Sequence, residues 1–529
     1  MISQLQMSYL VSQLRTDTEE DSRAPVSGLE ILKGGPLLIS TDNFSDSSTD
    51  SLALQKNNTN SAEVKQAIMS YLKIHEIEKN FDTITREFEN SIHESLQKSQ
   101  NCMLPCFNVV CDSNCLPDEY YAVIDIGGST LRISVIKFLE ENKAECIINK
   151  SWVIFDDNKH LDQQFFEWIA GNFKSLIAND MKVLLENSRG SMKVGITWSF
   201  PLLQIEAPNR AVVSDLGKGF SVCLEFKGKD LKDIFEESFT RFGLDIEIYA
   251  IINDSVSGFV AGSYLINSKL GLVQGTGVNS CFFVDKEKLS YGKIGFLKPN
   301  FGGEKILVNA EASFLGYHLF PHISEADKEM NPLWDVISEQ ELPYPHMTTG
   351  DYGVFQPLEV ITSGRYIPEI IRRILMKTMD MEKHSEGGAE YSLSAELLGE
   401  LCLSDDDDDD DEVRGKLCTA LQLEYISKDE IGILKIITEV VIHRASIVLA
   451  SYIIAMLRVS GHIDTDILTI SVVGSMLQHF PRYKETVLEI LGNKKHIYKL
   501  PNITFGFVED SSIYGAAIAA CATQRSLCL

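Results

Sequence analysis

The sequence predicts an α/β protein with more than one lobe, and three observations support this fold class. The chain has 529 residues, a length that suggests two or three lobes and a large core. Apolar residues recur at helical spacing from Ala62 to Phe88, whereas 121–138 and 270–284 have the pattern of buried strands. A glycine turn interrupts each of these two strand regions, which indicates a pair of hairpins.

The first 60 residues differ in composition from the rest of the chain. Ser, Thr, Asp and Asn are frequent there, apolar patches are brief, and 40–60 has the composition of a mobile tail. Helical periodicity begins near Ala62 and continues through Ile68, Leu72, Phe81 and Phe88. We therefore expect a tail over 1–60, followed by helices.

The two hairpins share one layout. Tyr121 to Asp125 is an apolar run that meets Gly127 and Gly128, and the strand pattern resumes over 131–138. About 150 residues later, 270–274 meets Gly275-Thr-Gly277 and continues as strand over 278–284. In a Rossmann unit the glycine loop would open a helix, so this layout favours a duplicated nucleotide-clamping fold. The alternative is two ordinary hairpins, because glycine turns are common.

The tip of the first hairpin, Asp125-Ile-Gly-Gly-Ser-Thr-Leu-Arg132, has the parts of a phosphate site. Glycines allow backbone N–H groups to approach an anion closely. Ser129 and Thr130 offer hydroxyl donors, and Arg132 offers a charged guanidinium. Asp125 could hold Mg2+ directly or through water. The second tip, 275–279, could bind the other end of a triphosphate.

Between the two tips, an apolar run ends in Asn253-Asp254-Ser255. A carboxylate at the end of a strand faces a cleft, where Asp254 could accept a proton from a substrate hydroxyl that attacks phosphorus. The alternative is that Asn-Asp-Ser simply caps a helix.

Charge excludes one class of function. The chain has 48 basic and 75 acidic side chains, a formal net charge of -27, which argues against generic nucleic-acid binding. Eight of the negative charges form the unbroken run Asp405–Glu412, which we interpret as a solvated inserted loop without a catalytic role.

Neither export nor membrane insertion is predicted. The first twenty residues lack a continuous apolar core, and the apolar stretch 445–457 is too short to span a bilayer and suits a buried helix. Of the 11 cysteines, Cys102, Cys106, Cys111 and Cys115 could form a zinc site. Their C-x3-C spacing and apolar neighbours favour ordinary packing instead.

The ordered motifs together resemble the eukaryotic hexokinase family of the actin-like ATPase superfamily. They are Met103-Leu-Pro-Cys-Phe107, Asp125–Arg132, Gly195–Gln204, Asn253-Asp254-Ser255, Gly275–Asn279, Thr362-Ser-Gly-Arg-Tyr366, Gly474-Ser475 and Glu509–Ala517. The resemblance covers the chain from about residue 62 onward and implies a two-lobed hexokinase (ribonuclease H-like) fold with a cleft between the lobes. It implies a large domain of 61–118 and 255–510 with an acidic insertion at 404–413, a small domain of 119–254 and 511–529, and a hinge near Asp254.

The resemblance also implies roles for individual residues. Asp254 would be the catalytic base, with Lys218 beside it at the catalytic site. The sugar would be bound by Ser199, Phe200, Lys218, Asn253, Asp254, Asn279, Glu311 and Glu359. ATP would be bound by Asp125, Gly127, Gly128, Ser129, Thr130, Arg132, Gly275, Thr276, Gly277, Gly474 and Ser475. ATP and Mg2+ would be the cofactors, with Mg2+ carried by ATP and Asp125 as the residue that could contact it.

Two departures from the family pattern bear on the sugar. The Thr-Lys pair of glucose enzymes is Gly217-Lys218 here, and the aromatic residue after the first glutamate is Ala312. Both changes would widen the pocket, which suits a 2-acetamido group. Gly195–Pro201, Lys150-Ser-Trp152, Thr362–Glu369 and Ser511–Ala517 resemble the fungal N-acetylglucosamine kinase branch more than the glucose enzymes.

We therefore expect ATP-dependent phosphorylation of the N-acetylglucosamine 6-hydroxyl in a cytoplasmic, amino-sugar catabolic setting. A glucose or broad-specificity hexokinase, and a hexokinase-like sugar-sensing regulator, stay open as alternatives. Small-molecule sugar and ATP are the expected partners, with no nucleic acid and no membrane. A regulatory protein partner, a nuclear fraction and the choice between monomer and homodimer are left open.

Overall fold

The computed structural model describes residues 61–107, 115–180, 191–200, 202–213, 220–295, 304–331, 334, 356–378, 388–404, 411–463 and 465–528. The chain divides into two units, Met1–Ser51 and Leu52–Leu529, and every described residue belongs to the second. The predicted tail, Cys111, Gly217-Lys218 and the acidic residues 405–410 lie outside the described residues.

One of the two main sheets has five strands. In spatial order they are β10 (Ile246–Asn253), β6 (Met192–Trp198), β2 (Tyr120–Ile126), β3 (Thr130–Phe138) and β4 (Ala144–Val153). β2 pairs with β3 and β3 with β4 in antiparallel fashion, whereas β6 runs parallel to both β2 and β10. β2 is buried from Tyr121 to Ile126, because helices cover both faces of the sheet.

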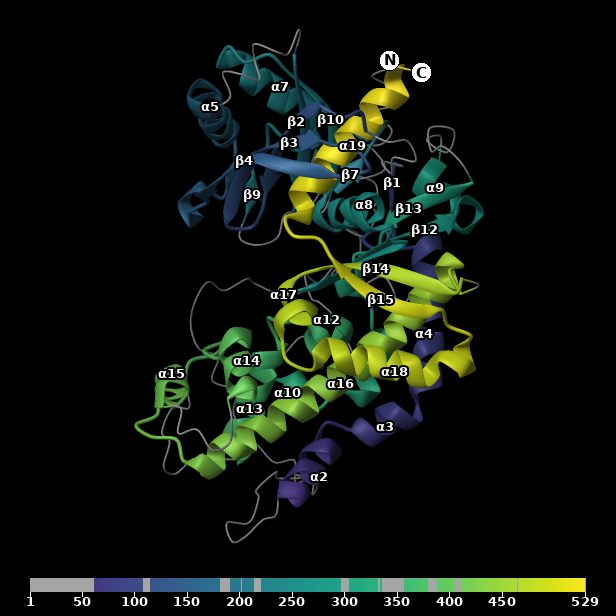
Figure 1. Cartoon of the computed structure of the whole chain (residues 1–529). Coiled ribbons are helices and arrows are strands. Elements are labelled where there is room, and N and C mark those ends of the chain that lie inside the picture. Colours follow the sequence, from purple (N-terminus) through teal and green to yellow (C-terminus); the bar gives the residue numbers. More distant parts are fainter. Residues whose placement is uncertain are drawn as a thin grey trace, which may run out of the picture. The chain divides into compact units, whose positions relative to one another are not determined.

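Two helices cover each face (Figure 1). On one face, α5 (Gln163–Asp180) and α7 (Leu231–Arg241) pack phenylalanines such as Phe166 and Phe235 against the strands. On the other face lie α8 (Asp254–Ile266) and the C-terminal α19 (Ser511–Cys528). The C-terminal helix therefore packs on the sheet of 120–253, as the resemblance implies.

The second main sheet has six strands. Their spatial order is β1 (Leu104–Cys106), β13 (Lys305–Asn309), β12 (Val278–Asp285), β11 (Leu270–Gln274), β14 (Ile467–Val473) and β15 (Asn502–Phe507). Two short strand pairs complete the described strands: β5 (His160–Leu161) runs parallel to β9 (Ser221–Val222), and β7 (Leu202–Gln204) forms a hairpin with β8 (Ala211–Val213). All strands of the six-stranded sheet lie within the predicted large domain and all those of the five-stranded sheet within the predicted small one; the exact domain bounds stay a prediction.

The helices around the six-stranded sheet form the largest core. They are α2 (Ser61–Tyr71), α3 (Ile74–Lys79), α4 (Phe81–Gln97), α12 (Pro357–Thr362), α13 (Ile367–Thr378), α14 (Ala395–Leu403), α15 (Asp411–Leu421), α16 (Lys428–Ser460), α17 (Ser475–His479) and α18 (Tyr483–Tyr498), with the short α9 (Tyr291–Ile294) and α10 (Glu325–Lys328). α4 shows why the early periodicity is helical: Phe81, Ile84, Phe88 and Ile92 form one buried stripe.

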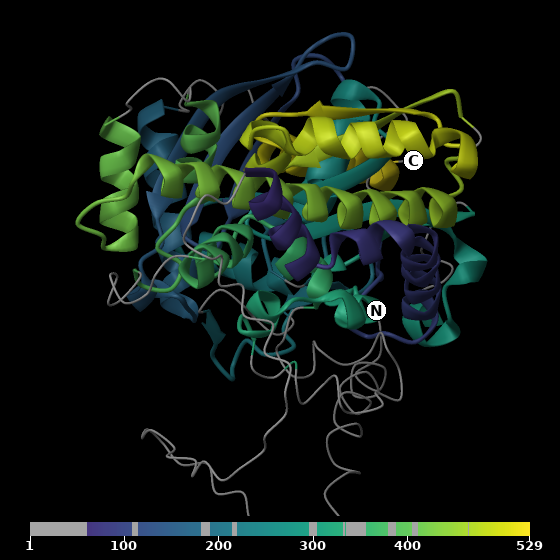
Figure 2. The same ribbon diagram turned by 90° about the horizontal axis from the view of Figure 1, so that it is seen from below.

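α16 is the central helix of this core. Figure 2 shows it running beside α18, with α2 to α4 on its other side. It begins at a capping box between Ser427 and Glu430 and ends before Gly461, which has a positive φ of 77°. Among the described residues it is the one helix long and apolar enough to cross a membrane, yet 94% of its most apolar 18-residue stretch is buried inside the protein. The prediction of a buried helix over 445–457 is thus confirmed, within a helix of 33 residues.

The two predicted hairpins are confirmed. β2 and β3 pair from Ile126–Leu131 outward, and β11 and β12 pair from Gln274–Val278 outward, each around a glycine turn. The acidic insertion needs a correction at its end. Asp411 and Glu412 form the first turn of α15 rather than a loop, where negative charge is favourable next to the unpaired N–H groups of a helix.

A buried ion pair joins α16 to α10. Arg444 donates from Nη1 and Nη2 to the two carboxylate oxygens of Asp327, at 2.7 and 2.8 Å, and both side chains are fully buried. Burial by itself would raise the pKa of Asp327, but Arg444 and the hydrogen bonds from Ser324 outweigh it, so the pKa lies below its usual range.

We expect Arg444→Met to lower the free energy of unfolding by about 3–5 kcal/mol, because it leaves a buried carboxylate without its partner. Urea unfolding followed by circular dichroism measures this. The matched control is Lys65→Met, which breaks the exposed ion pair between Lys65 of α2 and Glu439 of α16. This change should lower the free energy of unfolding by less than about 1 kcal/mol.

The pair should also make stability depend on acid. Since the pKa of Asp327 is lowered by folding, its contribution is complete above the unfolded carboxyl pKa of about 3.9 and is lost as the pH falls through the folded value. Arg444→Met should lack this acid-dependent loss. Equal free energies of unfolding for Arg444→Met and Lys65→Met would contradict a stabilising role for the buried ion pair. So would a stability that depends on pH in the same way with and without Arg444.

Candidate active site

The first hairpin tip is a tight turn. The N–H of Gly127 donates to the carbonyl of Thr130 at 2.9 Å, and a Cβ on Gly127 would lie 3.2 Å from that oxygen. The carbonyl of Ser129 accepts from the N–H of Ile154 at 2.8 Å, while the Ser129 side chain is exposed. The turn therefore holds Gly127 to Thr130 against the end of β4, with Ser129 outermost.

Asp125 and Arg132 face each other across this hairpin. Arg132 donates from Nε and Nη2 to Asp125 Oδ2, at 2.8 and 2.5 Å, and from Nη1 to Asp510 at 2.9 Å. Ser512 at the start of α19 also donates to Asp125 Oδ2, at 3.0 Å. The Arg132 charge is thus balanced by two carboxylates before any ligand binds. Its predicted phosphate contact stays a prediction.

The Asp254 carboxylate also affects the pKa of Asp125. Burial raises the pKa of Asp125 above its ordinary value, Arg132 and Ser512 offset part of the rise, and the Asp254 carboxylate adds to it. Ile126 and Asn253 both pair with Trp198 of β6, so Asp125 and Asp254 lie at the same end of the five-stranded sheet. The first hairpin and the predicted base therefore share one edge of this sheet.

The second hairpin tip is held from behind by backbone contacts. The N–H of Gly275 donates to the carbonyl of Gly277 at 3.0 Å, and the N–H of Gly364 donates to the carbonyl of Gly275 at 2.7 Å. Gly474 has a φ of 112°, and a Cβ there would lie 2.6 Å from the backbone of Gln274 and Gly275. The segment Gly474-Ser475 thus lies directly against the second tip, as a site for one nucleotide requires.

Arg365 is a residue of this region that sequence analysis missed. Its N–H donates to the carbonyl of Thr276 at 3.3 Å, and its exposed guanidinium lies over the rings of Tyr391 and Tyr366, 5.5 and 6.0 Å from their centroids. No carboxylate among the described residues pairs with it. It offers a cation at the tip where the sequence pattern showed only glycines and a threonine.

The predicted sugar residues meet around Asn309, a second residue that the sequence did not single out. Its Oδ1 accepts from Asn279 Nδ2 and Ser255 Oγ, each at 2.9 Å, and its Nδ2 donates to Glu311 Oε1 at 2.7 Å. Asn309 therefore joins the start of α8 to both Asn279 and Glu311. Its position at the end of an apolar strand, two residues before Glu311, is the signal that could have identified it.

Glu311 itself has backbone strain. Its φ of 47° is left-handed, a conformation uncommon outside glycine, asparagine and aspartate. Ala312 follows it, is fully buried, and donates its N–H to Asn279 Oδ1 at 3.1 Å. Strain of this kind persists where surrounding contacts enforce it, and it clusters at functional sites.

Glu359 reaches the same region from α12. Its Oε2 accepts from the N–H of Val278 at 2.6 Å, and a Cβ on Gly277 would lie 3.0 Å from Oε1. The N-cap of this helix, Gln356, has a buried side-chain amide that finds no hydrogen-bond partner within the described part of the chain, and its backbone N–H donates to the carbonyl of Ser313 at 3.0 Å. An unpartnered buried amide costs free energy unless a ligand satisfies it. Gln356 is therefore a third residue that sequence analysis missed.

Asn253 confirms the helix-cap interpretation of its motif, and the catalytic role of Asp254 stays a prediction. The Asn253 side chain accepts from the N–H and the hydroxyl of Ser255, at 3.0 and 2.8 Å, and donates to the carbonyl of Phe200 at 3.3 Å. It caps α8, as the alternative reading expected. Asp254 is the first residue of that helix, accepts from the N–H of Ser255 at 2.8 Å and is half-buried.

The remaining predicted residues are placed differently. The N–H of Ser199 donates to the carbonyl of Ile126 at 3.0 Å, which brings Ser199 beside the first hairpin. The Phe200 ring is 2% exposed and packs between Trp198 and Phe220, so its side chain belongs to the core. Lys218 lies outside the described residues.

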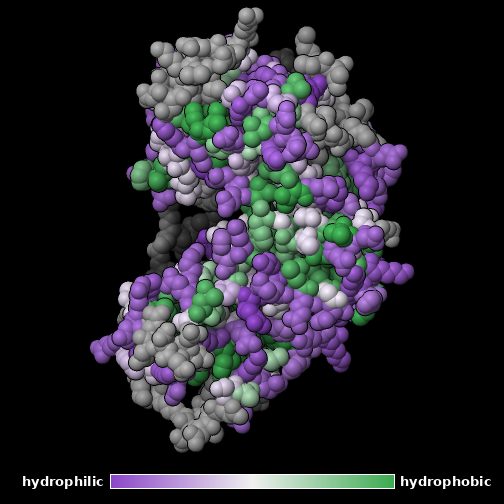
Figure 3. Space-filling view, in the orientation of Figure 1, coloured by the Kyte–Doolittle hydropathy of each residue, from purple (hydrophilic) through white to green (hydrophobic). Residues whose placement is uncertain are grey.

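Figure 3 shows the surface largely hydrophilic and hollowed between the parts around β9 and α14.

No metal site is built from protein groups in the described ranges. They contain no group of three or more His, Cys, Asp or Glu side chains arranged to hold a metal ion. Burial raises the pKa of Cys102 and of Cys106 to about 12. Within the described residues, Arg132 and Ser512 donate to Oδ2 of Asp125, and Oδ1 would fit a role in binding Mg2+ that arrives with a nucleotide.

Comparison with known proteins shows which family the sequence matches. Two sequence profiles, both described as hexokinase, match residues 67–264 and 269–522. The chain is 29% identical over 472 residues to N-acetylglucosamine kinase 1 of Candida albicans, covering 83% of this chain and 89% of that protein. It is 26% identical over 434 residues to the hexokinase of Kluyveromyces lactis, covering 77% and 81%.

Solved structures show the same fold. The hexokinase from Schistosoma mansoni complexed with glucose superimposes with a TM-score of 0.68 at 19% sequence identity, over 88% of this chain and all of that one. The predicted two-domain α/β fold is confirmed.

We expect Gly474→Ala to raise the KM for ATP about tenfold, because a strained φ of this kind costs roughly 1–3 kcal/mol and displaces the second tip. Steady-state kinetics at varied ATP measures the change. The control is Gly492→Ala inside α18, where a Cβ meets nothing within 4 Å. It should leave KM unchanged and stabilise the helix by up to about 1 kcal/mol. An unchanged KM in Gly474→Ala would contradict the placement of ATP.

Proposed function

The chain belongs to the hexokinase family of sugar kinases, and from this premise we propose that it phosphorylates the 6-hydroxyl of N-acetylglucosamine with ATP. Its product would be N-acetylglucosamine 6-phosphate, used in amino-sugar breakdown in the cytoplasm. The observation that carries this choice of sugar is the similarity to N-acetylglucosamine kinase 1 of Candida albicans over 83% of the chain. The resemblances quoted from the sequence motifs support the same branch.

The local chemistry at Glu311 agrees with this sugar. The resemblance places an aromatic residue after this glutamate in glucose enzymes, whereas here the position is Ala312, which is fully buried and bound to Asn279. A small side chain there would leave room for an acetamido group. Since losing or gaining one such contact is worth about 1–3 kcal/mol, the effect on preference is moderate.

In the proposed reaction, Asp254 accepts the proton of the sugar 6-hydroxyl as the oxygen attacks the terminal phosphorus. Asn309 holds Asn279 and Glu311 in fixed positions, so that several acceptors orient the sugar before attack. The backbone of the two hairpin tips and the Arg365 guanidinium would bind the triphosphate. Family members use ATP with a divalent metal, and Mg2+ supplies charge neutralisation on the phosphates when it is bound.

Asp254→Asn should lower kcat by about 10²–10⁴-fold, the usual contribution of a positioned base. The amide keeps an oxygen that can accept from the N–H of Ser255, so the melting temperature should stay close to that of the wild type. Asp429→Asn, an exposed carboxylate in the first turn of α16, is the control and should be fully active. Near-normal turnover in Asp254→Asn would overturn the assigned role.

A coupled spectrophotometric assay with glucose, mannose, glucosamine and N-acetylglucosamine tests the substrate. We expect kcat/KM for N-acetylglucosamine to exceed that for glucose by about tenfold or more. Comparable values would identify a broad-specificity hexokinase, and activity on glucose alone would refute the proposal. Sugar binding without turnover of any of the four would identify a sensor.

A further inference from the structure

β10, the strand that leads into Asp254, contains one extra residue. Ile248 and Ala250 pair with the consecutive residues Val194 and Gly195 of β6, so the register of the ladder shifts at Tyr249. This irregularity is a β-bulge, which bends a strand and turns its later side chains over. Such bulges often redirect a side chain next to an active site.

The bulge decides which way the end of β10 faces. Ile248 and Ile251 both belong to the core beneath α5 and α7, although they are three residues apart. Tyr249 and Ala250, although adjacent, both belong to the core beneath α8 and α19. In a regular strand, neighbours face opposite sides and residues two apart face the same side. The direction of Asn253 and Asp254 therefore depends on the extra residue.

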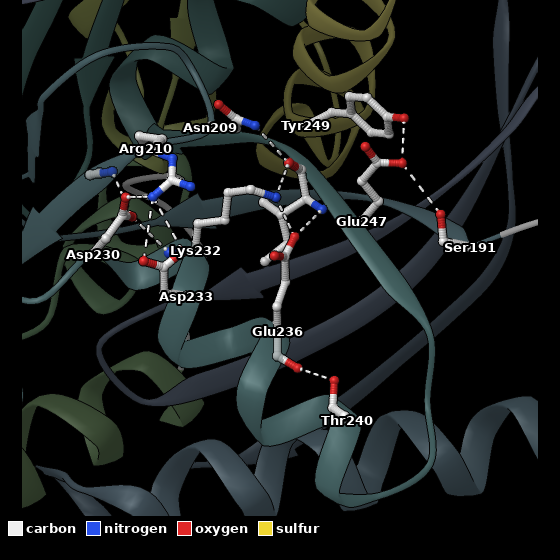
Figure 4. Close-up of polar contacts among 12 residues, drawn as sticks. Ser191, Asn209, Arg210, Asp230, Lys232, Asp233, Glu236, Thr240, Glu247 and Tyr249 are labelled. Atoms are coloured by element: carbon white, nitrogen blue, oxygen red, sulfur yellow. Dashed lines mark hydrogen bonds and ion pairs between the residues drawn. The ribbon is translucent and has the colours of Figure 1, made fainter. Parts of the chain in front are cut away.

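Side chains satisfy the backbone at the bulge. The N–H of Ile248 donates to Glu236 Oε1 at 3.1 Å, and its carbonyl accepts from Asn209 Nδ2 at 3.0 Å and Lys232 Nζ at 3.3 Å. Figure 4 shows Glu236 and Lys232, which pair with each other on α7, pointing toward this stretch of β10, with Asn209 arriving from the opposite side. As β10 is the edge strand of its sheet, no strand supplies these bonds.

A second contact holds the edge on the other side of the bulge. The N–H of Ile251 donates to the carbonyl of Pro208 at 2.8 Å, and its carbonyl accepts from Gln204 Nε2 at 2.9 Å. Gln204 Oε1 accepts from the N–H of Phe107, at 2.8 Å, just after β1 of the other sheet. The buried Gln204 amide thus connects β10, the β7–β8 hairpin and the six-stranded sheet.

The two contacts are tied together through Arg210, which follows Asn209. Arg210 pairs with the buried Asp230 at 2.8 Å and with Asp233 at 3.2 Å (Figure 4). Asp230 also caps α7 by accepting from the N–H of Lys232. The hairpin that carries Gln204 and Asn209 is therefore held to the helix that carries Glu236.

We propose that Glu236 and Gln204 are positioning residues of the phosphoryl transfer: they hold the bulge at Tyr249 and thereby set how β10 presents Asp254 to the sugar. This inference rests on the proposed function. Both residues act through the backbone of Ile248 and Ile251, without contact to sugar or ATP. Glu236 and Gln204 approach the strand from different elements and constrain it on opposite sides of the extra residue.

Glu236→Ala tests the proposal because it removes the acceptor for the N–H of Ile248. We expect kcat to fall by about 10–100-fold, the loss typical of a reacting group displaced by about 1 Å, with KM for sugar and ATP within about twofold. The KM values should hold because Asn279 and the second hairpin belong to the other sheet, and Glu311 and Glu359 lie in segments that contact that sheet. Gln204→Met removes the donor to the carbonyl of Ile251. It should likewise lower kcat while leaving both KM values nearly unchanged.

Two variants distinguish positioning from simple loss of stability. Glu236→Gln keeps an oxygen acceptor and should restore kcat to within about threefold of the wild type. Glu237→Ala removes the neighbouring side chain, which pairs with Arg241 at the end of α7, and should have wild-type kcat. The kinetic assays are run well below the melting temperature of each variant. The hydrogen-exchange rate of the Ile248 amide is measured in parallel. Wild-type kcat in Glu236→Ala despite an unprotected Ile248 amide would overturn the proposal.

A failure of the proposed function would be recognisable separately, because the wild-type protein would then phosphorylate none of the four sugars. The positional claim would in that case be tested by the crystal structure of Glu236→Ala. A shifted or lost bulge at Tyr249 would support it, and unchanged pairing of β10 with β6 would overturn it.

Discussion

The site depends on how closely the first turns of α8 and α19 approach each other. Ser257 Oγ donates to the carbonyl of Ser512 at 2.6 Å, and a Cβ on Gly515 would lie only 2.0 Å from the carbonyl of Ser257. Only glycine permits that approach. Ser512 then donates to Asp125, so one contact between helices places the first hairpin beside the helix that begins at Asp254. The C-terminal helix is thus part of the site's framework although it supplies no predicted ligand contact.

Electrostatics explain how an acidic protein can accommodate a polyanion. The net charge of -27 opposes a triphosphate at long range, so binding must rely on local groups. Arg132 carries the charge that the sequence pattern assigned to phosphate, but Asp125 and Asp510 already balance it. Arg365, stacked on two tyrosines beside the second tip, supplies a cation that no described carboxylate neutralises. In the proposed function, backbone amides and this guanidinium would together bind the triphosphate at the two tips.

The motif around Asp254 combines an observed helix cap with the carboxylate that we propose as the base. Asn253 is a helix cap, as the chemistry of Asn-Asp-Ser predicts, and its amide is occupied by Ser255 and Phe200. The cap is what starts α8 at Asp254, at the same end of the five-stranded sheet as Asp125. A local structural role for one residue therefore creates the setting for a chemical role in the next.

The sequence alone determined the α/β class, both glycine-tipped hairpins, the buried central helix and the family, because periodicity, turn chemistry and motif order are local properties of the chain. It also identified Asp125, Asp254, Asn279, Glu311 and Glu359 as candidates. Tertiary structure decided what joins them: the Asn309 amide, the Arg365 cation, the unpartnered Gln356 amide and the bulge at Tyr249. These depend on contacts between segments about 30 to 90 residues apart or on strand register, and a single sequence records no pairing between distant segments.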